Sequence, residues 1–339
     1  MKQATSPSTW RINLVFAGLI GFILIISFHL SLPHLRLPLQ FDGLNAFKTM
    51  FISILLEAMP FLLLGVVASS IMQVLIPETW IRRIIPRNPV LGVLIACLIG
   101  ILFPVCECGL IPIVRRLVSK GMPLYAGVAF FLSGPIVNPI VYSATLTAFR
   151  TRPEIAYARM GLAVAVSAII GLLVYAFIKN NPLKNTEESS VAHSHSDVSG
   201  HAHRRNGFEE MVKHAGSEFF DMGKYLILGS LITAFIQAFV PRSELVSMGQ
   251  GGLNSHLFMM GFAYILSLCS TSDAFVASSF VGTFSASSLL TFMVFGPMLD
   301  LKGTLMLAAV FKRKFVLMLA IAISLVVLAG SLLIGQIFL

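Results

Sequence analysis

The sequence is poor in charged residues and in cysteine. Only 12% of its 339 residues are Asp, Glu, Lys or Arg, whereas 56% are hydrophobic. This scarcity of charge excludes a soluble globular domain, and the chain is predicted to be an all-α integral membrane protein. Four cysteines in apolar settings are too few for a disulfide framework. No Walker motif is visible, which argues against direct ATP hydrolysis.

The formal net charge of +9 does not indicate a nucleic-acid partner, because the Lys and Arg residues lie in short loops beside apolar runs. Seven apolar runs are long enough to cross a bilayer. They are Val15–Leu30, Met50–Ile76, Met122–Ala148, Met160–Ile178, Phe219–Val240, Leu289–Phe311 and Phe315–Leu339. The first run lacks a following small-residue cleavage site, so we expect an uncleaved helix rather than a signal peptide.

The chain repeats itself. The segment from Glu57 to Pro77 matches the segment from Asp221 to Pro241, with an acid, a glycine, a glutamine and a proline at one offset. Two further motifs recur in the same order at nearly the same offset: PVCECG with SLCSTSD, and SGPIVNP with FGPMLDL. We therefore predict two homologous halves.

Two apolar segments are interrupted by these motifs, Val90 to Val118 and His256 to Gly282. If each dips into the membrane and returns, most Lys and Arg residues fall on the amino-terminal side, as the positive-inside rule requires. Arg150, Arg152 and Arg159 are misfits in this arrangement. Each half then has three transmembrane helices and one re-entrant broken-helix hairpin, so the repeats are inverted.

The predicted organisation has four parts, with a cytoplasmic amino terminus. They are an N-terminal helix and loop at 1–43, a first membrane repeat at 44–179, a linker at 180–216 and a second membrane repeat at 217–339. The linker is rich in Ser, His and charge and is expected to be solvated and cytoplasmic. Four histidines in it are weak candidates for binding a metal: His193, His195, His201 and His203.

The motif PVCECGLIP places two thiols and a carboxylate at a helix break. Pro104 and Pro112 disfavour a continuous helix, and unwound backbone at membrane depth is tolerated only inside protein or beside a wet cavity. In an extended stretch Cys106 and Cys108 point the same way and Glu107 points oppositely. The thiols suit a soft ion or electrophile, and Cys269 of the other half is a third candidate ligand. Simple packing of buried cysteine is the alternative.

Ionisable groups inside apolar segments are functional candidates because burying a charge in lipid is costly. They are Glu57, Glu107, Asp221, Lys224, Asp273, Asp300 and Lys302. The neighbours Asp221 and Lys224, like Asp300 and Lys302, are spaced to form structural salt bridges. Three acids have no basic residue nearby in sequence, Glu57, Glu107 and Asp273, and are the better candidates for proton coupling, since desolvation favours a protonated carboxyl.

The Gly-Pro motifs are predicted to interrupt helices and to place Asn138 and Asp300 inside them. There, the two side chains can bind freed backbone groups or a substrate. Packing at a helix kink is the alternative.

From Pro104 to Pro139 the chain resembles the predicted permease family of the YraQ and ArsP type, which includes efflux permeases for trivalent organoarsenicals. The likeness extends from about Leu44 to the carboxyl terminus, with the strings Cys-Glu-Cys-Gly and Ser-Gly-Pro-Ile-Val-Asn-Pro as its specific marks. The resemblance implies a multi-pass permease of a bacterial-type inner (plasma) membrane, with Cys106 and Cys108 at the family's thiol motif.

We therefore predict a secondary transporter, not an enzyme, that exports a soft, thiol-reactive small molecule or metalloid with proton coupling. No haem, flavin or quinone signature is visible, and no cofactor is predicted. One alternative is a membrane thiol redox protein in which Cys106 and Cys108 form a disulfide. The other is a divalent-metal permease, suggested by the His-rich linker. The oligomeric state is left open.

Overall fold

The computed structural model describes residues 42–75, 86, 88–102, 106–178, 182–183, 206–239 and 252–337. Residues Gly43–Leu339 form one compact unit, separate from Met1–Asp42. The predicted first crossing, Val15–Leu30, lies outside the described residues, as do the four linker histidines.

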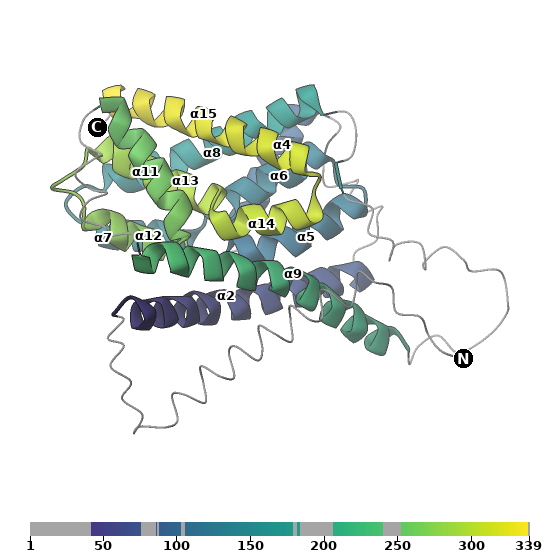
Figure 1. The fold of residues 1–339 in the computed structure, drawn as a ribbon. Coiled ribbons are helices and arrows are strands. Elements are labelled where there is room, and N and C mark those ends of the chain that lie inside the picture. The colour runs from purple at the N-terminus through teal and green to yellow at the C-terminus, as the bar shows by residue number, and fades with distance from the viewer. Residues whose placement is uncertain are drawn as a thin grey trace, which may run out of the picture. The chain divides into compact units, whose positions relative to one another are not determined.

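Helices make up nearly all of the described structure, as the sequence predicted for an all-α protein (Figure 1). In chain order they are α2 (Asp42–Leu75), α4 (Pro89–Leu102), α5 (Glu107–Ser119), α6 (Leu124–Ser133), α7 (Pro139–Ala148), α8 (Glu154–Phe177), α9 (Asn206–Phe239), α11 (Gly252–Leu266), α12 (Ser272–Ser278), α13 (Ala286–Met298), α14 (Leu301–Val310) and α15 (Arg313–Ile337). Outside these helices, Leu183 and Phe311 form an isolated antiparallel bridge.

Five stretches of the described helices are long and apolar enough to cross a membrane. They are Asn45–Met72, Glu154–Phe177, Ala215–Ala238, Ala286–Val310 and Arg313–Ile337. Each corresponds to one of the predicted crossings, although Ala286–Val310 consists of two helices, α13 and α14, which are separated at Leu299 and Asp300. The protein is therefore a multi-pass membrane protein, as the composition indicated.

The crossing predicted at Met122–Ala148 is not one helix. It divides into α6 and α7, which are separated at Gly134–Asn138. Prolines at positions 135 and 139 lack the N–H that a continuing helix would use, and Asn138 caps the new helix. The expectation that Asn138 and Asp300 lie inside helices is wrong for the same reason, because Asp300 caps α14.

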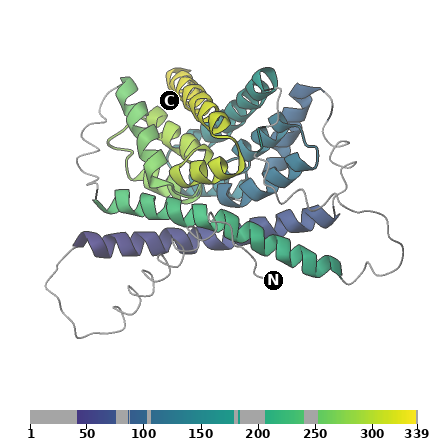
Figure 2. The same cartoon turned by 45° about the vertical axis from the view of Figure 1, so that its right-hand side comes forward.

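Packing is similar within the two halves of the chain. Helices α4, α6 and α8 pack on one another in the first half, and α11, α13 and α15 do so in the second. In Figure 2 the first group, in blue and teal, and the second, in green and yellow, lie side by side above α2 and α9. The two halves meet where α8 packs on α13 and α15.

Two short helices reach across from one half to the other. Helix α5 of the first half packs on α14 of the second, and α12 of the second half packs on α7 of the first. Both α5 and α12 follow a helix break at the predicted hairpin: α4 ends at Leu102 before α5, and α11 ends at Leu266 before α12. These exchanged contacts bring the polar motifs of both halves into the interior.

Helices α2 and α9 lie side by side and cross beneath the other helices, with Phe47 against Phe235 at 6.4 Å between ring centroids (Figure 2). Each carries a glycine at a close approach to a neighbour. A Cβ on Gly65 of α2 would overlap the backbone of Gly109 in α5, and one on Gly229 of α9 would lie 2.8 Å from Lys302 Cα in α14. The repeated glycine thus marks close helix contacts in both halves.

Candidate functional site

The first polar cluster joins α5 to α14 and consists of Glu107, Asp300 and Lys302, which we call the α5–α14 cluster. All three side chains are buried, with 3%, 2% and 5% of their residues' surface exposed. The Lys302 ammonium lies 3.4 Å from Glu107 Oε1 and 3.7 Å from Asp300 Oδ2. The sequence predicted the contact with Asp300, but the expectation that Glu107 lacks a basic neighbour is wrong.

The break between α11 and α12 completes this cluster. Lys302 Nζ donates a hydrogen bond of 2.8 Å to the carbonyl oxygen of Ser267. Ser267 has a φ of 47°, in the left-handed region that non-glycine residues rarely adopt. Such strain is tolerated where the surrounding structure fixes it, and here the fixed carbonyl serves as an acceptor for a buried cation.

Local helix chemistry positions Asp300 and Glu107. Asp300 is the N-cap of α14, and its Oδ1 accepts a 2.7 Å hydrogen bond from the Gly303 backbone N–H. Glu107 is the first residue of α5, where a carboxylate is favoured by the helix dipole.

Two thiols flank Glu107 in the sequence, and a third comes from the other half of the chain. Cys106 is the extended N-cap residue of α5, with φ −68° and ψ 166°, whereas Glu107 and Cys108 already belong to the helix. The expectation that all three lie in one extended stretch, with the carboxylate opposite the thiols, is therefore wrong. Even so, Cys106 and Cys108 interact through their side chains.

Cys269, from the break of the other half, lies close enough to Cys106 and Glu107 to interact electrostatically with both. Its sulfur accepts a hydrogen bond from Thr271 Oγ1 at 3.5 Å. Cys108 is buried, while Cys106 and Cys269 are half-buried. Within the part of the chain that the structure describes, no group of three or more Cys, His, Asp or Glu side chains is arranged to hold a metal ion.

The second polar cluster joins α8 to α12 and consists of Arg159 and Asp273, which we call the α8–α12 cluster. Arg159 Nη2 donates to Asp273 Oδ2 at 2.7 Å and to the Ser270 carbonyl at 3.0 Å. Arg159 Nη1 donates to Thr145 Oγ1 of α7 at 2.9 Å. Arg159 is fully buried and Asp273 is 2% exposed, so Asp273 does have a basic partner, contrary to the prediction.

Arg159 is the buried cation that sequence reasoning did not assign to a site. It directly precedes the apolar run at Met160–Ile178, so it was counted among the loop charges that set topology. Its poor fit to the positive-inside pattern could have indicated this, because a cation that does not serve topology is expected to have a buried partner.

Asn138 corresponds in the repeat to Asp300 and has the same structural role. It is the N-cap of α7, where its Oδ1 accepts a 2.9 Å hydrogen bond from the Val141 backbone N–H. Its Nδ2 donates to the carbonyl oxygens of Gly134 and Pro135, at 3.2 and 3.3 Å. The prediction that this residue binds backbone groups freed by the Gly-Pro break is thus confirmed.

The remaining predicted acids lie elsewhere. Asp221 and Lys224 form the expected pair on α9, at 2.7 Å and partly exposed. Glu57 lies on an exposed position of α2. These residues therefore lie outside both buried clusters.

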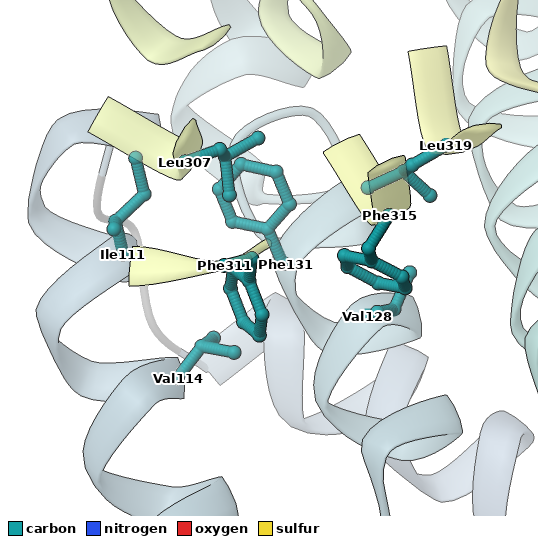
Figure 3. Close-up of a pocket in the computed structure, with 8 residues that line it drawn as sticks. All are labelled: Ile111, Val114, Val128, Phe131, Leu307, Phe311, Phe315 and Leu319. Carbon is teal, nitrogen blue, oxygen red and sulfur yellow. The ribbon is translucent and has the colours of Figure 1, made fainter. Parts of the chain in front are cut away.

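A small apolar pocket lies between α5, α6 and the junction of α14 with α15 (Figure 3). Its volume is about 10 Å³, room for about one water molecule. Eight apolar side chains line it: Ile111, Val114, Val128, Phe131, Leu307, Phe311, Phe315 and Leu319. It has neither the size nor the polar groups of a solute site.

Broken helices with charged side chains buried between two halves are typical of membrane transport proteins. The chain belongs to the family of predicted permeases designated ArsP_1, whose model matches residues 43–336. This confirms the family indicated by the Cys-Glu-Cys-Gly and Gly-Pro motifs. No solved structure matches the chain.

Curated relatives agree with this family. The chain is 49% identical to UPF0718 protein YcgR of Bacillus subtilis over 85% of this chain and 96% of that protein. It is 35% identical to a putative two-component membrane permease complex subunit of Streptococcus mutans, over 84% and 93% of the two chains. UPF0718 protein YraQ of Escherichia coli is 26% identical over 35% of this chain and 34% of its own length.

Proposed function

We propose that this permease is a secondary transporter that exports a soft, thiol-reactive solute, with a trivalent organoarsenical as the model substrate. The observation that carries the proposal is the position of the thiols. Cys106 and Cys108 at the start of α5, together with Cys269 from the other half, lie beside the buried α5–α14 cluster. Thiolate sulfur prefers soft partners to hard cations.

We also propose that the two halves are inverted repeats that move against each other. The matching caps at Asn138 and Asp300, and the exchanged contacts of α5 with α14 and α12 with α7, support this relation. In transporters of this architecture the solute site lies where broken helices from both repeats meet. We assign the solute site to the thiols and acids near the starts of α5 and α12.

Proton coupling is the third part of the proposal. The candidates are Glu107 or Asp273, whose carboxyl groups are buried between the halves, and each contacts a cation of the other half. A change in protonation at such a contact alters the interaction between the halves, which links a proton to a conformational change. The amino terminus is taken to be cytoplasmic, so that export corresponds to uptake into everted vesicles.

The test is uptake of a trivalent organoarsenical into everted membrane vesicles. We expect the double variant Cys106→Ser/Cys108→Ser to lose most uptake at unchanged protein level. Cys97→Ser is the matched control, since Cys97 is a buried cysteine of α4 outside the site. Equal uptake by the wild type and the double variant would remove the thiols from the mechanism.

A further inference from the structure

The two buried clusters differ in charge balance. The α8–α12 cluster pairs one guanidinium with one carboxylate. The α5–α14 cluster has two carboxyl groups, on Glu107 and Asp300, and one ammonium, on Lys302. Fully ionised, it would hold one unbalanced negative charge among side chains that are at least 95% buried. An unbalanced charge at this depth is strongly unfavourable, so a positive ion is required.

Hydrogen bonding in the cluster is also incomplete. Glu107 Oε2 and Asp300 Oδ2 are buried and have no hydrogen-bond partner among the described residues. The distances from Lys302 Nζ to these carboxyl groups, 3.4 and 3.7 Å, exceed those of ordinary hydrogen bonds, and its short bond goes to Ser267 O. The Ser267 hydroxyl, although near Asp300, is directed at the Tyr264 carbonyl. A carboxyl oxygen in this cluster is therefore free to carry a hydrogen.

We propose that Glu107 and Asp300 share a single exchangeable proton, and that this cluster, rather than Asp273, is the proton-coupling site of the permease. The inference rests on the proposed function for its role in transport, but the proton site itself does not depend on the solute. A proton fits better than an alkali cation because the Lys302 ammonium already contacts both carboxyl groups and donates to the Ser267 carbonyl, an oxygen that an alkali cation would need as a ligand.

The groups around Glu107 connect the proposed proton site to the thiols of the proposed solute site. Lys302 and Asp300 approach it from α14, and Cys106 and Cys108 lie beside it on α5. Cys269, from the break of the second half, also interacts with Glu107. Asp273 interacts with Glu107 too, but more strongly with Arg159. When the proton is bound, Glu107 no longer attracts Lys302, and the contact between α5 and α14 weakens. When the proton leaves, the ion pair between the halves is restored.

The α8–α12 cluster differs in its charge balance. Asp273 Oδ1 and Arg159 Nε also have no hydrogen-bond partner among the described residues, so incomplete hydrogen bonding is common to both clusters. The charges of the α8–α12 cluster balance, and Arg159 also binds Thr145 Oγ1 and the Ser270 carbonyl at hydrogen-bond distance. Removing the negative charge of Asp273 would leave a buried guanidinium unbalanced. This cluster therefore holds no exchangeable proton and fixes α12 to α7 and α8.

The test is infrared difference spectroscopy of the full chain in lipid, following the carbonyl stretch of protonated carboxyl groups as pH changes. The wild type is expected to show one titrating carboxylic acid. Glu107→Gln and Asp300→Asn should each abolish that band, because either change balances the cluster, and Lys302→Met should double it. Asp300→Asn retains the capping oxygen, so it keeps the test valid if Glu107→Gln does not fold.

Glu57→Gln and Asp221→Asn, at carboxyl groups outside both clusters, are the matched controls and should leave the titrating band in place. A band that survives both Glu107→Gln and Asp300→Asn would overturn the proposal, as would the absence of any titrating band. Loss of the band on adding sodium at constant pH would overturn the proposal, because it would show that the cluster binds an alkali cation in place of the proton. If the band behaves as expected but no organoarsenical uptake is found, the proton site stands and the proposed solute is wrong.

Discussion

The α5–α14 and α8–α12 clusters both connect the first half of the chain to the second, yet they are built differently. Arg159 forms three hydrogen bonds of 3.0 Å or less in a charge-balanced site. Lys302 forms one short hydrogen bond and two longer ionic contacts in a site with an extra carboxyl group. A buried pair with matched charge keeps both partners ionised, whereas a site with an extra carboxyl group can change its protonation. This difference is the basis for proposing a structural role for the Arg159–Asp273 contact and a coupling role for the α5–α14 cluster.

The largest loss of stability is expected from Arg159→Met. It leaves the buried Asp273 carboxylate without its cation and the Ser270 carbonyl without its donor, a loss of about 3–5 kcal/mol of stability. We expect the variant to melt far below the wild type or to fail to fold, as measured by size exclusion after heating. The double change Arg159→Met/Asp273→Leu removes both charges and should recover much of the loss. A wild-type melting temperature for the single variant would show that this contact is not structural.

Lys302→Met is expected to cost less than Arg159→Met, because Glu107 and Asp300 can each take up a proton once the ammonium is gone. The native state of this variant would hold more protons than the unfolded chain, so its stability should fall as pH rises. Melting temperatures of the variant and the wild type from pH 5 to pH 8 measure this difference, with the gap widening toward higher pH. A gap that does not depend on pH would contradict the proposed proton uptake.

A smaller effect is expected from Gly229→Ala, which acts on the α5–α14 cluster through the backbone. The new Cβ would lie 2.8 Å from Lys302 Cα, so α9 and α14 must separate slightly, at a cost of about 1–3 kcal/mol. Gly223→Ala is a matched control on the same helix, since nothing lies within 4 Å of its Cβ position. The melting temperature should fall for Gly229→Ala only. Equal melting temperatures of the two variants would show that the close approach of Gly229 to Lys302 does not constrain the packing of α9 on α14.

The sequence predicted the helical membrane class, five crossings of the described region and both hairpin breaks, because apolar length and proline position determine these features locally. It also located the acids and the thiols. It did not find the partners of Glu107 and Asp273, since Lys302 and Arg159 lie in the opposite halves of the chain and only the three-dimensional packing brings them together. The crossing at Met122–Ala148 was mistaken for one helix because its apolar run continues through the break that Pro135, Asn138 and Pro139 create.

The central claim is that the thiols of the two halves meet beside the buried acids. The direct measurement uses a chain with Cys97 and Cys108 replaced by serine, leaving Cys106 and Cys269, and with a protease site inserted in the His-rich linker. After treatment of native membranes with a short bifunctional thiol reagent and cleavage, the account predicts that the two fragments stay joined on a denaturing gel. Fragments that separate as freely as those of a matched chain retaining only Cys97 and Cys269 would contradict it.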